Sequence, residues 1–190
     1  MRALHVNWRD LPPEPWKNGG GVTRTLAVDD AARARKMPPR WRVSVADITS
    51  DGAYSRFPGV DRVSVVLSGA GVALRGDGVD IALLPGRAVA FAGDVALQSR
   101  LLDGAVRVLN LFVLRGAVHA QVRCGGAQPV IVNAGSWEDA DAHASHVRMV
   151  VDAQNFYIDS SCQDDAASAD ALPPDAVRID LRMAAPGAFC

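Results

Sequence analysis

The chain has 190 residues, which suits one large domain or two small domains that pack closely. Hydrophobic residues make up 49% of the chain, so it can bury a sizeable core and global disorder is excluded. Its 20 basic and 21 acidic side chains give a net charge of −1, without the basic excess of a nucleic-acid-binding protein.

The sequence also carries indications of its cellular compartment. No apolar run is long enough to cross a bilayer. The first residues hold charges and prolines where a signal peptide has its apolar region. Cys124, Cys162 and Cys190 are odd in number and lack paired metal spacing. We therefore expect a cytoplasmic protein with reduced thiols.

Short runs rich in β-branched residues recur between Gly, Pro, Asp and Ser, a spacing typical of a β-sandwich or barrel. The expected strands are Trp41–Ile48, Arg62–Leu67, Gly71–Leu74, Arg87–Phe91, Val95–Leu101, Val106–Leu114, Val118–Arg123, Val130–Val132, His146–Val151 and Ala176–Met183. One short helix is predicted over Ser136–His146, with Ser136 as its N-cap. The pattern predicts an all-β fold.

The segment Pro15–Arg24, which reads PWKNGGGVTR, contains three consecutive glycines. Glycine permits left-handed backbone and leaves the amides open to a ligand, and successive amides can form a concave anion site. Lys17 and Arg24 have the charge to strengthen such a site. The alternative is an ordinary glycine turn between two strands, and the sequence leaves both open. No GK[ST] follows at the spacing of a phosphate-binding loop.

Side-chain alternation along the expected strands indicates a second candidate ligand-binding site. Along Trp41–Ile48 it places Arg42 and Ser44 on the face opposite the apolar side chains. The next expected strand repeats the pattern with Arg62 and Ser64. Two neighbouring strands would thus each present an arginine and a serine, either to water or to a ligand cavity inside a small barrel.

The segment Phe57–Arg62, which reads FPGVDR, contains a rigid Pro-Gly turn before a strand. The turn delivers Phe57 and Arg62 to the start of that strand. An arginine fixed in this way can bind a carboxylate through two parallel hydrogen bonds.

Asn110 interrupts the apolar face of the expected strand Val106–Leu114. A buried amide needs hydrogen-bond partners, because without them its burial costs free energy. Asn110 therefore either braces a loop or faces a polar pocket.

Other catalytic and metal-binding patterns are weak. No serine lies in a G-x-S-x-G motif, and no cysteine has a basic or histidine neighbour that would obviously lower its pKa. Asp47, Asp51 and Asp61 could supply paired carboxylates, although turn roles explain them as well. His143 and His146 have helical i, i+3 spacing near several acids, but zinc or iron needs at least three ligands.

Several segments together resemble one family. PWKNGGGVTR, WRVSVADITSDGAYSRFPGVDR, LSGAGVAL, FAGDVALQSRLLDG and VLNLFVLRG follow one another in register within residues 4–116. In this order they are similar to the HutD/Ves family of small bacterial proteins. The resemblance implies a bicupin, two fused double-stranded β-helix lobes, with boundaries here near residues 1–116 and 117–190.

The resemblance also implies a function. Members are regarded as accessory or regulatory proteins of histidine utilisation, with a pocket for a small carboxylate such as urocanate or a formylated glutamate. A homodimer is a possible assembly. Metal-binding cupins carry a G-x₅-H-x-H-x₃₋₄-E pattern, which is absent here, so we expect no metal and no other cofactor.

Two positions depart from the family pattern. An acidic residue usually follows the Thr-Arg pair, where this chain has Thr25. Another usually lies two positions before the asparagine, where this chain has Val108. If the two acids form one polar network in relatives, this chain has lost both.

From these features we predict one ligand-binding set: Trp16, Lys17, Asn18, Gly19, Gly20, Gly21, Thr23, Arg24, Arg42, Phe57, Arg62 and Asn110. Two alternatives remain. One is a metal-independent isomerase or hydrolase that uses Asp47 or a neighbouring acid as general base. The other is a protein-interaction or self-association face anchored by exposed Trp16 and Phe57.

Overall fold

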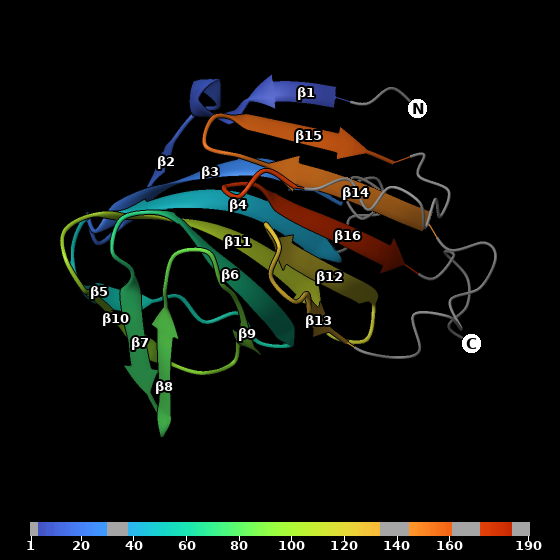
Figure 1. Ribbon diagram of the computed structural model, residues 1–190. Helices are drawn as coiled ribbons and strands as arrows, with labels where there is room; N and C mark the ends of the chain where they lie inside the picture. The colour runs from blue at the N-terminus through green and yellow to red at the C-terminus, as the bar shows by residue number, and fades with distance from the viewer. Residues whose placement is uncertain (1–3, 30–37, 134–144, 161–171, 184–190) are drawn as a thin grey trace.

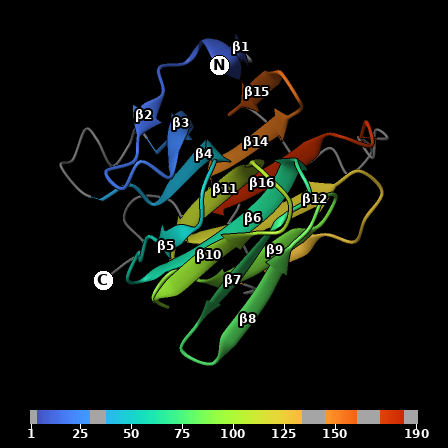
Figure 2. The ribbon, with the colours of Figure 1, turned by 90° about the vertical axis from the view of Figure 1, so that its left-hand side faces the viewer.

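The computed structural model describes residues 4–29, 38–133, 145–160 and 172–183. Within these residues the protein is all-β, and its one helical element is a short 3₁₀ turn, η1 (Trp8–Asp10). The strands form three sheets of antiparallel neighbours, which Figures 1 and 2 show from two sides. No helix in this part of the chain is long and apolar enough to cross a membrane.

The central sheet has the order β2 (Glu14–Pro15), β3 (Gly21–Val28), β4 (Trp41–Ile48), β11 (Val106–Leu114), β6 (Val60–Ser68), β9 (Ala88–Ala92). The small outer sheet has the order β5 (Gly52–Tyr54), β10 (Leu97–Leu101), β7 (Val72–Gly76), β8 (Val79–Leu83). The large outer sheet has the order β1 (Leu4–Asn7), β15 (Asn155–Asp159), β14 (Ser145–Val151), β16 (Val177–Met183), β12 (Val118–Cys124), β13 (Val130–Val132).

The central sheet contributes to two hydrophobic cores, one on each face. Alternation along β4 sends Val43 and Val45 into the core shared with the large outer sheet. It sends Ala46 and Ile48 into the core shared with the small outer sheet. Because both faces are covered, β11 is apolar along almost its whole length, and Asn110 is the one polar side chain buried in it.

Three expected strands, Trp41–Ile48, Val106–Leu114 and Val130–Val132, have the predicted bounds. The other seven expected strands also occur, with ends that differ by one or two residues. Six further strands of the structure were not expected from the sequence: β1, β2, β3, β5, β8 and β15. These are short or lie near sheet edges, where one exposed face weakens the apolar signal.

The helix predicted over Ser136–His146 is wrong at its C-terminal end. Ser145 and His146 belong to β14 and pair with Met183 and Arg182 of β16, so sheet pairing overrides local helix propensity there. Residues 136–144 lie outside the described part of the chain. The predicted boundary between two lobes near residue 116 stays a prediction. Strand β1, from the N-terminal side of that boundary, pairs with β15, from the C-terminal side, in the large outer sheet.

Candidate functional site

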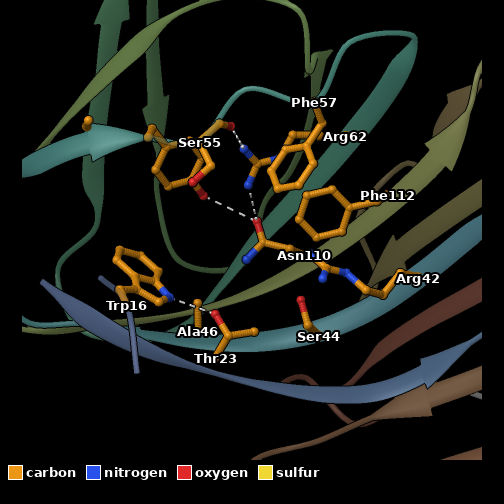
Figure 3. Close-up of a pocket in the computed structure, with 12 residues that line it drawn as sticks. Trp16, Thr23, Arg42, Ser44, Ala46, Ser55, Phe57, Arg62, Asn110 and Phe112 are labelled. Carbon is orange, nitrogen blue, oxygen red and sulfur yellow. Dashed lines mark hydrogen bonds between the residues drawn. The ribbon is translucent and has the colours of Figure 1, made fainter. Parts of the chain in front are cut away.

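A cavity of about 70 Å³ lies on the face of the central sheet that is turned toward the small outer sheet. Its volume corresponds to a few water molecules or one small metabolite fragment. Its lining residues are Trp16, Thr23, Arg42, Ser44, Ala46, Ala53, Tyr54, Ser55, Phe57, Arg62, Asn110 and Phe112 (Figure 3). The lining holds two arginines and no acidic side chain.

The floor of the cavity consists of two cross-strand rows centred on β11. Phe112 pairs with Arg42 on β4 and with Arg62 on β6. Asn110 pairs with Ser44 and Ser64 on the same two strands. The Arg–Ser pattern predicted from alternation is therefore confirmed, but the two strands are not neighbours, because β11 lies between them.

Asn110 organises the β6 side of the cavity. Its Oδ1 accepts hydrogen bonds from Ser64 Oγ at 2.8 Å, Arg62 Nη2 at 3.1 Å and Tyr54 Oη at 3.3 Å. Its Nδ2 donates to the carbonyl of Val108 at 3.3 Å. An amide oxygen has two lone pairs, so three donors exceed its capacity. Asn110 was expected either to brace a loop or to face a polar pocket, and in the structure it faces the pocket.

Arg62 is only 4% exposed and is surrounded by aromatic rings. Its guanidinium carbon lies 4.3–5.4 Å from four ring centroids, those of Tyr54, Phe112, Phe91 and Phe57. Its Nη1 donates to the carbonyl of Ser55, and its Nε has no partner among the described residues. Burial lowers the pKa of Arg62 from its usual value, and Tyr54 opposes that shift. The result is a buried cation without a counter-ion in the described structure.

Arg42 is the second cation of the cavity. Its guanidinium carbon lies 4.5 Å from the centroid of Phe112 and 5.8 Å from that of Phe57. Burial lowers the pKa of Arg42 as well, and the carboxylate of Glu14 opposes the shift from beyond ion-pair distance. Among the described residues the Arg42 side chain makes no hydrogen bond or ion pair.

Trp16 and Thr23 complete the wall beside β4. The indole Nε1 of Trp16 donates to Thr23 Oγ1 at 2.8 Å, and this bond links the residue that follows β2 to β3 across the hairpin (Figure 3). Half of the predicted ligand-binding set thus lines the cavity: Trp16, Thr23, Arg42, Phe57, Arg62 and Asn110. Whether these residues bind a ligand stays a prediction.

The three glycines lie outside the cavity lining. Gly19 has a φ of +72°, as a tight hairpin turn requires, and the backbone of Gly21 packs against the carbonyl of Asp47 so closely that a Cβ would collide with it. A Cβ on Gly20 would meet Ser50 Oγ at 3.2 Å. Turn geometry and close packing account for the triplet, in agreement with the glycine-turn alternative.

Lys17, Asn18 and Arg24 also lie outside the lining. Lys17 is exposed, and Asn18 Oδ1 accepts the amide of Gly20. Arg24 follows Thr23 directly, so alternation turns it to the opposite face of the central sheet. There Arg24 and Arg107 bind the two carboxylate oxygens of Asp47 at 2.9 and 2.6 Å.

Six lining residues were absent from the predicted set: Ser44, Ala46, Ala53, Tyr54, Ser55 and Phe112. Strand alternation could have supplied Ser44 and Ala46 through Arg42, and Phe112 through Asn110. Tyr54 and Ser55 come from the end of β5 and the loop after it, in a different sheet. No local pattern indicates that they meet the central sheet.

The catalytic alternative has little support in this geometry. Asp47 lies on the opposite face, and two arginines hold its carboxylate. Cys124 is buried, and burial raises the pKa of its thiol to about 11. Within the described residues no three His, Cys, Asp or Glu side chains are grouped to hold a metal ion; His143 lies outside them.

Comparison with known proteins places the chain in a family. The sequence model described as HutD matches residues 8–172. The chain belongs to the HutD family. Among its HutD-family relatives, an uncharacterized 21.2 kDa protein from the hutC 3′ region of Pseudomonas putida is 34% identical over 142 residues, which are 74% of each chain. Protein Ves of Citrobacter koseri is 32% identical over 70% of this chain and 74% of its own.

Solved structures agree with the HutD assignment. HutD from Pseudomonas fluorescens SBW25, determined in a formate condition, is 25% identical and matches 98% of this chain and 100% of its own with a TM-score of 0.68. A conserved protein of unknown function from Pseudomonas aeruginosa PAO1 has the same fold, with 24% identity, a TM-score of 0.64, and coverage of 98% and 95%. The all-β class expected from the sequence is confirmed, and the chain shares the fold of this HutD structure over nearly its whole length.

Proposed function

We propose that this HutD-family protein binds a small carboxylate in the cavity above Arg62 and serves as an accessory or regulatory factor in histidine utilisation. The observation that carries the proposal is the charge of the cavity: two arginines line it and no acidic side chain does. Isolated buried charges are costly, so an arginine this deeply buried calls for an anionic partner.

The donor count supports the same ligand class. Asn110 Oδ1 is shared by three donors, and Arg62 Nε has no partner in the described structure. The site therefore holds surplus donors, and a carboxylate supplies acceptors that match a guanidinium in geometry and charge. The aromatic rings around Arg62 exclude water and strengthen that interaction.

A binding role fits the cavity better than catalysis does. The lining has Ser, Thr and Tyr hydroxyls but no Asp, Glu, His or Cys side chain, so it holds no carboxylate or imidazole that could act as a base to activate a hydroxyl. The relation to histidine utilisation follows from the family and from the P. putida relative of the hutC 3′ region. Urocanate and formylglutamate are the carboxylates of that pathway that we would test first.

Thermal unfolding tests the proposal. A ligand that binds only the folded state raises the Tm by mass action, so we expect formate, acetate, urocanate or formylglutamate at millimolar concentration to raise it. Arg62→Lys should abolish that rise, because a lysine cannot donate two parallel hydrogen bonds. Arg100→Met, which removes an exposed arginine of β10, is the control. No stabilisation of the wild-type protein by any of these acids would refute the proposal.

A further inference from the structure

The two halves of the cavity differ in how their polar groups are satisfied. On the β6 side, Arg62 and Ser64 both donate to Asn110 Oδ1. On the β4 side, Arg42 and Ser44 occupy the mirror positions of the same two rows. Yet within the described residues neither of these two side chains makes a hydrogen bond. Figure 3 shows Arg62 on one side of Asn110 and Arg42 with Ser44 on the other.

Geometry keeps the two arginines apart but within reach of one small molecule. Their guanidinium carbons lie 4.5 and 4.7 Å from the Phe112 centroid, so they are less than about 10 Å from one another. Arg42 and Arg62 come from strands on either side of β11, with Phe112 between them in the row. At such a separation the two guanidiniums can bind either one carboxylate between them or one carboxylate each, and the charge of the lining decides between these arrangements.

We propose that Arg42 and Ser44 form a second acceptor-binding subsite, and that the ligand of this pocket is a short dicarboxylate with one carboxylate at each arginine. This inference rests on the proposed function, since it assigns the first carboxylate to Arg62. Arg62 is held by its neighbours and receives one end of the ligand in a fixed position. Arg42, which is half-buried and unpaired in the described structure, pairs with the other end, and the Ser44 hydroxyl donates to the same carboxylate.

The physical reason for the second carboxylate is charge balance. The cavity lining has a formal charge of +2, and a monocarboxylate neutralises half of it. The mutual repulsion of the arginines is already visible, because Arg42 contributes to lowering the pKa of Arg62. A dicarboxylate removes this repulsion and pairs both cations at once.

The test is calorimetric titration of acetate, malonate, succinate, glutarate and inorganic phosphate into the wild-type protein, Arg42→Met, Ser44→Ala and Arg100→Met. We expect at least one dicarboxylate to bind wild-type protein ten-fold or more tightly than acetate. Arg42→Met should weaken that dicarboxylate ten-fold or more and leave acetate within two-fold. Ser44→Ala should act in the same direction with a smaller effect, about three-fold, and Arg100→Met should change nothing. The Tm of each ligand-free variant checks that it is folded.

Three outcomes would overturn the inference. One is equal affinity for acetate and all three dicarboxylates, and another is tighter binding of phosphate than of any dicarboxylate. The third is an equal loss of acetate and dicarboxylate binding in Arg42→Met, which would mean that both arginines hold a single carboxylate. In each case acetate binding that depends on Arg62 leaves the proposed function standing. Failure of every acid to bind refutes both proposals.

Discussion

The amide oxygen of Asn110 lies 3.1 Å from Nη2 of Arg62, at a point where two other donors also converge on it. Asn110 is the polar interruption of an otherwise apolar central strand, and Arg62 is a buried cation without an acidic partner in the described structure. The two residues depend on one another, because each is a hydrogen-bond partner for the buried polar group of the other.

Two substitutions of Asn110 should separate stability from binding. Asn110→Leu leaves Arg62, Ser64 and Tyr54 without their common acceptor, and we expect a loss of about 2–4 kcal/mol in the free energy of unfolding. Asn110→Asp keeps an acceptor and adds a negative charge beside Arg62, so it should fold stably but compete with an incoming carboxylate. Urea unfolding and acetate titration measure the two effects. Wild-type acetate affinity in Asn110→Asp would contradict this account.

Sequence patterns predicted much of this cavity wherever alternation within one strand was enough. Arg42 and Ser44 lie on the predicted face of β4, and Arg62 and Ser64 on that of β6. The pairing order of strands is a long-range property, and no local pattern indicates that β11 separates these two strands. The contribution of Tyr54 depends on the packing of one sheet against another, which sequence spacing does not encode.

For the glycine triplet, in contrast, composition alone was misleading about the cavity lining. Its composition suited an anion site, yet Gly21 is needed for close packing against Asp47 and Gly19 for a left-handed turn. Gly19→Asn should therefore cost no more than about 1 kcal/mol, because asparagine tolerates that backbone conformation. Gly21→Ala should cost about 1–3 kcal/mol, since its Cβ meets backbone that must move. Chemical unfolding of the two variants tests this ranking.

Neither glycine variant should alter carboxylate binding, provided that it folds, because both positions lie outside the cavity lining. Acetate titration of Gly19→Asn is the cleaner measurement, since nothing lies within 4 Å of a Cβ built there. A ten-fold loss of acetate affinity in Gly19→Asn would show that the glycine turn does take part in carboxylate binding.

Asp94 anchors the turn that delivers Phe57, and this contact should give stability a dependence on pH. Its carboxylate accepts the amide of Gly59 and pairs with Arg115, and both interactions lower the pKa of Asp94, the Gly59 bond most strongly. Since the pKa is lower in the folded state, the stabilisation is present above the unfolded value near 3.8 and is lost as the pH falls further.

Asp94→Asn should accordingly have a lower Tm than the wild-type protein at pH 7, and the difference should shrink at pH 3. Thermal scans of both proteins between these pH values measure the effect. Asp80→Asn is the matched control, because Asp80 pairs with Arg75 at an exposed position far from the turn in sequence. A Tm difference that is the same at both pH values would show that the Asp94 charge is not involved.

Asp47 offers the test that separates a binding protein from a hydrolase or isomerase with a carboxylate base. It lies on the face of the central sheet opposite the cavity, where Arg24 and Arg107 hold both of its oxygens. Asp47→Asn weakens both contacts, and we expect a loss of about 1–2 kcal/mol in the free energy of unfolding, less than for a fully buried pair because the Asp47 side chain is 23% exposed. Acetate affinity should stay within two-fold of the wild-type value, because no charge in the cavity changes. If Asp47 acted as a general base near the ligand, removing its charge would alter the affinity for an anion, and a change of ten-fold or more would favour the catalytic alternative.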